Sequence, residues 1–168
     1  MQDFWFKYNV NDTYMITGYK GNEAIVNLPS SYYGKPVTII YDNVFQNHPE
    51  ITEIHFPDTI TELGGFLFQN CTSLKKISLP PQLKWLWQYA FVRSSITEIT
   101  IPDTVIRLVP FTFQECHDLQ IVYLPNTLKR ISSWTFKDCE NLREIHLSRH
   151  TEIAENAIPE QAELLYID

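Results

Sequence analysis

Apolar residues recur along this chain with a period of about 23 residues. Phenylalanines stand at five positions separated by 23, 23, 22 and 23 residues: Phe45, Phe68, Phe91, Phe113 and Phe136. Prolines keep the same period, with separations of 23, 22 and 23 residues: Pro57, Pro80, Pro102 and Pro125. Two residue types that share one period of this length indicate a repeat protein, in which successive units stack on one another.

Each repeat contains a short segment of alternating apolar and polar residues that ends at the proline. In residues 77–79 (Ile-Ser-Leu) the two apolar side chains point to one side, as in a half-buried strand. Pro80 then ends the strand, because it has no N–H to donate. A second apolar pair follows at Leu83 and Leu86, and we expect a single helical turn or tight bend near the next repeat phenylalanine. Stacking would align the repeat phenylalanines in one buried column, since one unit alone cannot bury its apolar face.

The two ends of the chain depart from the repeat. Residues 4–20 contain two β-prone runs around a polar cluster at residues 11–13, which is typical of a β-hairpin. Stacked repeats need atypical end units to cover the open core, so we interpret this hairpin as a cap. In the tail, Ser148 stands where proline is expected. We therefore expect a single domain, 1–168, made of three parts: an N-terminal cap at 1–23, repeats at 24–147 and a C-terminal cap at 148–168.

The repeat resembles the BspA-type leucine-rich repeat of bacterial surface proteins. The segments CTSLKKISLPPQLKWLWQYAF, from Cys71, and CHDLQIVYLPNTLKRISSWTF, from Cys116, follow that family's order of C-x-x-L-x-x-I-x-L-P and an A-F-like end. The resemblance covers roughly residues 14–168 and implies an α/β leucine-rich-repeat solenoid, a horseshoe of five to six rungs with two caps. It also implies a secreted or cell-surface protein that is not an enzyme and that binds a protein or glycan, as in adhesion.

Composition and charge narrow the possible partners. Hydrophobic residues make up 44% of the chain and aromatic residues 14%, which excludes disorder. The net charge of −7 argues against a nucleic-acid partner, because phosphate binding needs clustered lysine and arginine. No apolar run approaches the roughly 18 residues of a membrane helix, so we expect no membrane insertion. The first residues, MQDFWFKYNV, lack the basic segment and apolar core of a secretory signal, and the residues alone leave the localisation open.

The cysteine, histidine and glutamate residues of the repeats do not form a catalytic or metal site. Three cysteines share one repeat position, and we expect reduced, buried packing residues there: Cys71, Cys116 and Cys139. His55 and His146 are four rungs apart, or roughly 19 Å, too far to bind one zinc ion together. Glu53 and Glu98 are two rungs apart, or roughly 10 Å, just outside the spacing of a glycosidase carboxylate pair. We predict no enzyme activity, no cofactor and no metal site.

One group of aromatic residues stands out from the repeat. Large rings occupy the place two residues before the repeat phenylalanine on four successive rungs, a place that is usually polar in the resembling family, and two tryptophans flank them. We call these six residues the aromatic ridge: Phe66, Trp85, Trp87, Tyr89, Phe111 and Trp134. Either the rings fold over the phenylalanine column and thicken the core, or they are exposed and contact a partner. In the second case the ridge is the binding site for a protein or glycan, or alternatively the interface of a homodimer.

Overall fold

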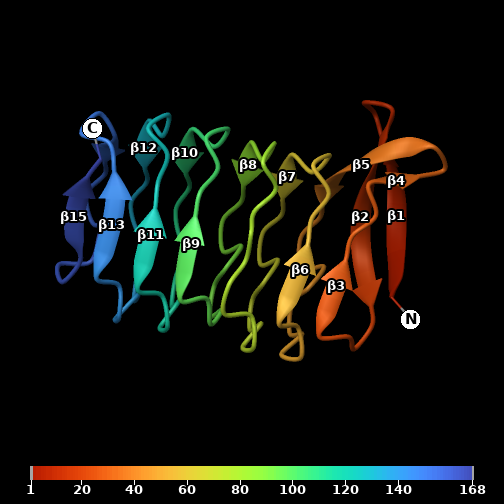
Figure 1. Ribbon diagram of the computed structural model, residues 1–168, viewed down its shortest axis with the longest axis horizontal. Coiled ribbons are helices and arrows are strands. Elements are labelled where there is room, and N and C mark those ends of the chain that lie inside the picture. Colours follow the sequence, from red (N-terminus) through yellow and green to blue (C-terminus); the bar gives the residue numbers. More distant parts are fainter. Residues whose placement is uncertain (1, 168) are drawn as a thin grey trace.

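The computed structural model describes residues 2–167 and forms a β-solenoid of about seven turns. Most turns contribute one strand to a front sheet and one to a back sheet, and the turns follow one another in an elongated row (Figure 1). The front strands are β3 (Ile25–Asn27), β6 (Glu53–His55), β9 (Glu98–Thr100), β11 (Ile121–Tyr123), β13 (Glu144–Leu147) and β15 (Glu163–Tyr166). The back strands are β5 (Lys35–Ile40), β7 (Glu62–Leu63), β8 (Trp85–Leu86), β10 (Arg107–Leu108), β12 (Arg130–Ile131) and β14 (Glu152–Ile153).

The chain begins with the hairpin that the sequence predicts. β1 (Asp3–Asn9) pairs antiparallel with β2 (Thr13–Lys20), and β2 pairs parallel with β5, so the hairpin continues the back sheet. β4 (Ser31–Tyr32) lies between β3 and β5 in the sequence and pairs antiparallel with β5. Phe4 and Phe6 of the hairpin pack against the buried core, so the hairpin adds apolar contacts at the N-terminal end of the row.

The expected α/β class is wrong for residues 2–167, because they contain no α-helix. Successive tight turns connect the back sheet to the front sheet instead. In one such connection Gln69 N donates to Phe66 O and Cys71 N donates to Phe68 O, which are bonds between residues three apart. Phe66 and Asn70 have left-handed φ values of 54° and 61°. Two left-handed residues four positions apart in such a connection prevent a right-handed helix from extending.

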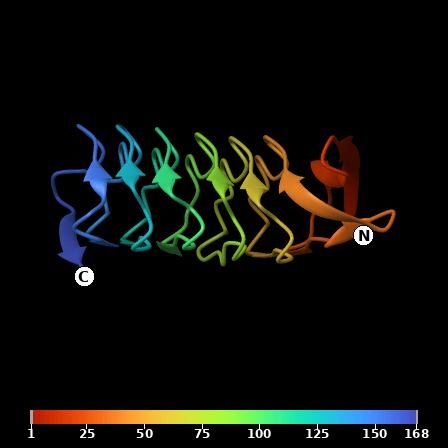
Figure 2. The same cartoon turned by 90° about the horizontal axis from the view of Figure 1, so that it is seen from above.

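The expected count of five to six rungs is lower than the observed number of about seven turns. The tail accounts for part of this difference, since β15 pairs parallel with β13 and β14 pairs parallel with β12. These strands continue the parallel pairing of both sheets. The row of turns is nearly straight in the view from above, without the pronounced curve of a horseshoe (Figure 2).

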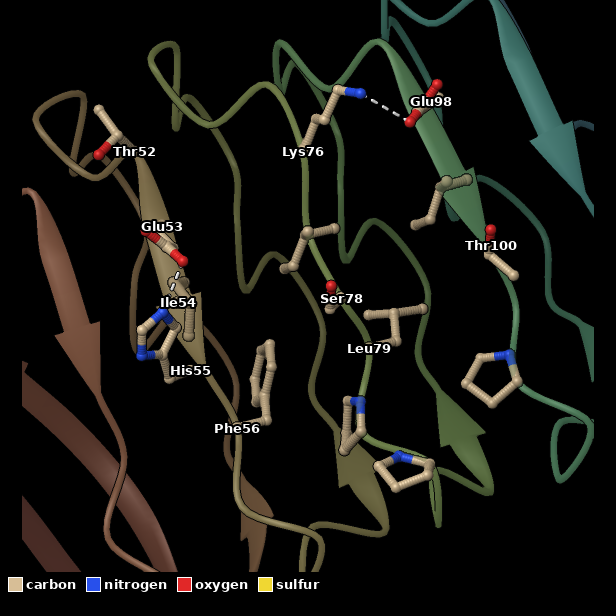
Figure 3. A pocket seen from close by; sticks show the side chains of 15 residues that line it. Thr52, Glu53, Ile54, His55, Phe56, Lys76, Ser78, Leu79, Glu98 and Thr100 are labelled. Atoms are coloured by element: carbon tan, nitrogen blue, oxygen red, sulfur yellow. Dashed lines mark hydrogen bonds and ion pairs between the residues drawn. The ribbon is translucent and has the colours of Figure 1, made fainter.

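Both sheets are interrupted near the middle of the solenoid. The front sheet divides into β3–β6 and β9–β11–β13–β15, and the back sheet divides between β8 and β10. Lys76 and Ser78 belong to the rung between β6 and β9, which forms no strand (Figure 3). On this rung Ile77 is only half-buried, whereas the equivalent Ile54 and Ile99 are buried. The 22-residue step between repeats falls here, and the interruption opens a groove on the front face.

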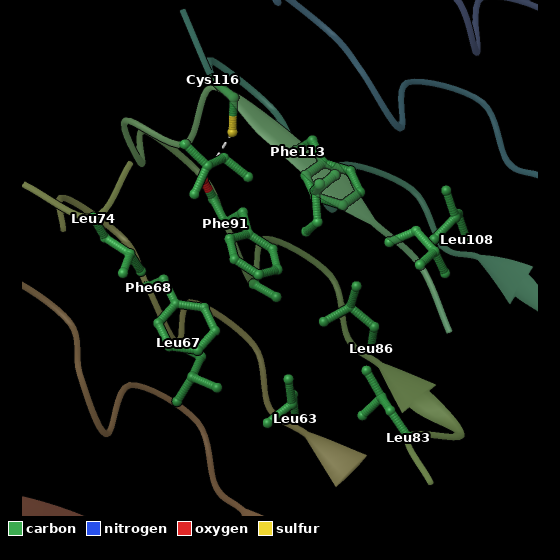
Figure 4. Packing of buried hydrophobic residues seen from close by; sticks show 14 of the residues in the cluster. Leu63, Leu67, Phe68, Leu74, Leu83, Leu86, Phe91, Leu108, Phe113 and Cys116 are labelled. Carbon is green, nitrogen blue, oxygen red and sulfur yellow. Dashed lines mark hydrogen bonds between the residues drawn. The ribbon is translucent and has the colours of Figure 1, made fainter. Parts of the chain in front are cut away.

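The core consists of stacked columns of apolar side chains, as the period predicts. All five repeat phenylalanines are 0% exposed, and neighbouring ring centroids lie 4.8 to 6.0 Å apart. A leucine column formed by Leu63, Leu86 and Leu108 runs beside Phe68, Phe91 and Phe113 (Figure 4). The prediction of one buried phenylalanine column is therefore confirmed.

The cysteines are free and buried, which confirms their predicted role in packing. Each thiol donates a hydrogen bond to a backbone carbonyl of the preceding turn: Cys71 to Phe45 at 3.1 Å, Cys116 to Phe91 at 3.0 Å and Cys139 to Phe113 at 2.9 Å. Burial raises the pKa of the Cys71 thiol to about 12. A thiol held in its neutral form in this way is a poor nucleophile.

Candidate binding surface

The ridge residues two positions before the repeat phenylalanines have an unusual backbone conformation. Phe66, Tyr89, Phe111 and Trp134 all have φ between 54° and 63°, in the left-handed region. In the flanking turns the same position is occupied by asparagine, at Asn43 with φ 64° and Asn156 with φ 58°. Asparagine tolerates this region, whereas bulky residues are held there at a cost of about 1 kcal/mol or more each. The solenoid therefore requires a left-handed residue at this position but does not require a large ring.

Three rings of this column, Phe66, Tyr89 and Phe111, stack on one another along the solenoid axis. The Phe66 and Tyr89 centroids are 4.7 Å apart with planes at 10°, and the Tyr89 and Phe111 centroids are 5.2 Å apart with planes at 2°. Phe66 is 37% exposed and Trp134 is 41% exposed, while Tyr89 and Phe111 are half-buried. None of the four belongs to the buried core cluster or to the partly buried residues packed against it. The rings form a separate outer column, which disfavours the interpretation that they thicken the core.

Trp85 and Trp87 extend this surface across β8 and the residue after its end. Trp85 is 45% exposed and Trp87 is 43% exposed, and their ring centroids are 6.0 Å apart with planes at 18°. The indole N–H of Trp87 donates to Glu62 Oε1 at 2.8 Å, which fixes the orientation of that ring. At the other end of the ridge, Lys137 Nζ lies 5.6 Å from the centre of the Trp134 ring, within range of a cation–π contact.

A cavity of about 510 Å³ lies over Gly64 and Gly65, beside the first rings of the ridge. We call it the glycine hollow. Its walls include aromatic rings and two carboxylates: Tyr41, Asp42, Glu62, Phe66, Trp87 and Tyr89. The repeat pattern of the sequence does not predict this cavity. The sequence feature that could have indicated it is the Gly64-Gly65 pair, the only Gly-Gly pair in the sequence. The next turn carries Trp87 and Gln88 at the equivalent positions.

The front groove, a second cavity of about 1040 Å³, opens where the front sheet is interrupted (Figure 3). Its charged side chains bond to one another. His55 Nε2 lies 2.6 Å from Glu53 Oε1, and Lys76 Nζ donates to Glu98 Oε1 at 2.8 Å. The bond to Glu98 raises the pKa of Lys76. The groove thus offers a solvated polar surface whose charges already have partners.

The residues considered for metal binding lie apart from one another. His55 contacts Glu53 and Asn27, while the His146 ring stacks on Tyr123 with centroids 4.6 Å apart. Among residues 2–167, no group of three histidine, cysteine, aspartate or glutamate side chains could hold a metal ion. The same part of the chain contains no helix long and apolar enough to cross a membrane.

The repeats show how the chain is related to known proteins. A family model described as the BspA type leucine rich repeat region matches residues 38–164 in six copies. The chain belongs to the BspA-type leucine-rich-repeat family. This confirms the resemblance drawn from the repeat, and it places the chain among repeats found in bacterial surface proteins. No curated protein matches the chain.

Solved structures of bacterial leucine-rich-repeat proteins support the fold. A T. pallidum leucine-rich-repeat protein (TpLRR) is 22% identical with a TM-score of 0.72, covering 94% of this chain and 88% of that one. The pneumococcal vaccine antigen PcpA is 19% identical with a TM-score of 0.76, covering 88% of this chain and 37% of that one. A leucine-rich-repeat protein from Eubacterium ventriosum is 26% identical with a TM-score of 0.69, covering 96% and 48%. The chain therefore spans most of the first of these proteins but less than half of the other two.

Proposed function

We propose that this chain is a non-enzymatic binding module of a bacterial surface protein, which contacts a protein or glycan through the aromatic ridge. The observation that carries the proposal is the backbone conformation of the ridge. Four large rings occupy the same left-handed position on four consecutive turns, a position at which asparagine folds at lower cost. Strained residues of this kind persist where the surrounding fold holds them in place, and they cluster at functional sites.

The chemistry of the two faces supports the ridge over the front groove as the contact surface. The ridge presents tryptophan, tyrosine and phenylalanine rings that are half-buried or exposed. Such rings bring large contact area at low entropic cost and are enriched at binding hot spots. In the front groove Glu53, His55, Lys76 and Glu98 form pairs with each other. A partner at the groove would have to compete with these bonds.

The test compares two double variants of matched composition. Tyr89→Ser with Trp134→Ser removes two ridge rings, and Trp5→Ser with Tyr123→Ser removes two exposed rings elsewhere. Binding is screened on immobilised glycans and surface proteins, and each hit is measured with both variants. We expect the ridge variant to weaken a true hit by about 30-fold or more, and the control variant to bind normally.

Two results of this comparison would contradict the proposal. If the control variant weakens binding as much as the ridge variant does, the ridge is not the contact surface. If the ridge variant unfolds, its rings are part of the folding core and their exposure has no functional meaning. Far-UV circular dichroism of both variants distinguishes these two results.

Self-association through the ridge is the second candidate function. It is favoured by the same exposed rings, because a stacked column can pack against its own copy about a two-fold axis. Light scattering at micromolar concentration separates the two candidates. A mass of 19.7 kDa would reject the homodimer, and twice that mass, reduced to one chain by Tyr89→Ser with Trp134→Ser, would support it.

A further inference from the structure

The glycine hollow exists because one turn lacks two side chains that its neighbours have. Gly64 and Gly65 stand between Tyr41 and Asp42 of the preceding turn and the Trp87-Gln88 pair of the following turn. A Cβ atom on Gly64 would lie 2.6 Å from both the backbone N and Oδ1 of Asp42. Asp42 therefore packs directly against Gly64, and no larger residue fits there without moving the backbone. At Gly64 and Gly65 the hollow is lined by backbone alone.

Aromatic rings form the two sides of the hollow. Tyr41 and Trp87 are both about half exposed and stand two turns apart, which is roughly 10 Å at about 4.8 Å per turn. A flat group stacked on one ring lies about 3.5 Å from it. A planar group therefore fits between these two turns while it stacks on either ring. Phe66 is the first ring of the stacked column, since the preceding turn carries Asn43 in that place. One face of Phe66 is therefore not covered by another ring of the column.

The charge of the hollow is negative and uncompensated. Asp42 and Glu62 line it, and none of its eleven lining residues is lysine, arginine or histidine. Asp42 Oδ1 accepts a hydrogen bond from Gly65 N at 2.7 Å, and Glu62 Oε1 accepts one from the Trp87 indole. These bonds orient both carboxylates without neutralising them. Within residues 2–167 neither carboxylate makes an ion pair, in contrast to Glu53, Glu98 and Glu115.

We propose that the glycine hollow binds an arginine side chain of a protein partner. A guanidinium group is planar, stacks on aromatic rings and donates several hydrogen bonds to carboxylates. The hollow offers rings on its sides and two oriented carboxylates with no cation of their own. A lysine ammonium would satisfy the charge but has no flat face to stack on the rings that line the hollow. The proposal rests on the proposed binding function and specifies the partner as a protein with an exposed arginine.

The test uses short peptides and the tryptophan indole signals in ¹H–¹⁵N NMR spectra of the whole chain. The probe is acetyl-Gly-Arg-Gly-amide, and its matched control replaces arginine with citrulline, which has the same shape but no charge. We expect the Trp87 indole signal and the Gly64 and Gly65 amide signals to shift in a saturable way with the arginine peptide, at a Kd below about 10 mM. The citrulline peptide should leave these signals unchanged.

Variants of the chain locate the effect. Glu62→Gln keeps the size of the side chain and removes one charge, and it should weaken arginine binding by about tenfold. Glu155→Gln is the control, because it removes the same charge at an exposed position four turns from Gly65. Asp42→Asn is a second, independent variant, since its side-chain oxygen can still accept the bond from Gly65. Unchanged urea midpoints would show that all three variants are folded.

Several results would overturn the inference. These are no saturable shift with arginine, equal shifts with citrulline, or equal weakening by Glu62→Gln and Glu155→Gln. Shifts of the Trp87 indole with choline or with a neutral oligosaccharide, but not with arginine, would assign the hollow to another ligand. The arginine peptide could fail to bind while the double variant, Tyr89→Ser with Trp134→Ser, still abolishes partner binding. That result would reject the arginine site and leave the proposed function supported. The arginine peptide could instead bind while the same double variant leaves partner binding unchanged. That result would reject the proposed function.

Discussion

Replacement of Trp134 by asparagine separates the cost of the left-handed backbone from the value of the ring. Trp134 has φ 63° and is 41% exposed, and the carbonyl of Asn156 in the next turn accepts its backbone N–H at 3.0 Å. Asn156 itself has φ 58° at the equivalent position, so the fold already accommodates asparagine there. Trp134 has no stacked ring partner among the described residues, and its one charged contact is with Lys137 at 5.6 Å.

The expected magnitude follows from three contributions. Loss of the exposed cation–π contact costs about 0.5–1 kcal/mol, and both Trp134→Asn and Trp134→Ala lose it. Both variants also lose the partly buried area of the ring, which cancels when they are compared. Asparagine relieves about 1 kcal/mol of left-handed strain that alanine keeps. We therefore expect Trp134→Asn to be more stable than Trp134→Ala by about 1 kcal/mol.

Urea unfolding followed by far-UV circular dichroism measures these differences. The comparison is valid where the slope of unfolding free energy with urea concentration is the same for the three proteins. The reasoning is refuted if asparagine is no better than alanine, because the strain would then be absent. It is also refuted if both variants lose more than about 3 kcal/mol, a loss typical of a ring in a packed core.

Three further predictions address the core and the cysteines. Phe113→Ala should lower the free energy of unfolding by about 3–5 kcal/mol, because the ring is 0% exposed between two stacked neighbours; a loss below about 1 kcal/mol would mean that the repeat register is wrong. A thiol reagent should label few of the cysteines in the native protein and all three after denaturation, and a disulfide between Cys116 and Cys139 in the native protein would contradict this. Stability should fall as pH rises from about 9 towards 12, since the Cys71 thiol ionises at its ordinary value of 9.0 in the unfolded chain and at about 12 in the folded one. Cys71→Ala should reduce this slope in urea titrations at several pH values, and an unchanged slope would exclude Cys71 as its source.

The features of the fold that could be predicted from the sequence are mainly those that recur in each repeat. The phenylalanine column and the buried cysteines follow from apolar side chains at a fixed period, because stacking brings equal positions together. The hairpin at residues 3–20 follows from local turn chemistry. The absence of helix was harder to predict, since Arg93 and Glu115 adopt left-handed φ values that nothing in their residue types indicates. The count of turns was too low because Ser148 replaces the proline that marks each repeat, although β15 still pairs with β13.

The candidate site was predictable as a list of residues but not as a geometry. The spacing of Phe66, Tyr89 and Phe111 predicts adjacent rings, and the structure stacks them. Whether those rings lie inside or outside the core depends on the direction in which a left-handed residue projects its side chain. No periodicity carries that information. The glycine hollow depends on the absence of side chains at Gly64 and Gly65. The cavity can be recognised only when the three turns that line it are stacked in the structure.

The distribution of residues along the left-handed column indicates where a partner would contact the solenoid. From the N-terminal to the C-terminal side the column contains Asn43, Phe66, Tyr89, Phe111, Trp134 and Asn156, all with φ between 54° and 64°. The backbone requirement is the same throughout, so it cannot explain why rings occupy only the four central turns. Core packing cannot explain it either, because the repeat phenylalanines already fill the core with 0% exposure. What the four turns share is one contiguous surface, roughly 14 Å long, that begins at the glycine hollow. The four rings raise the cost of folding at their turns and add nothing to the core. Contact with a binding partner best explains their presence.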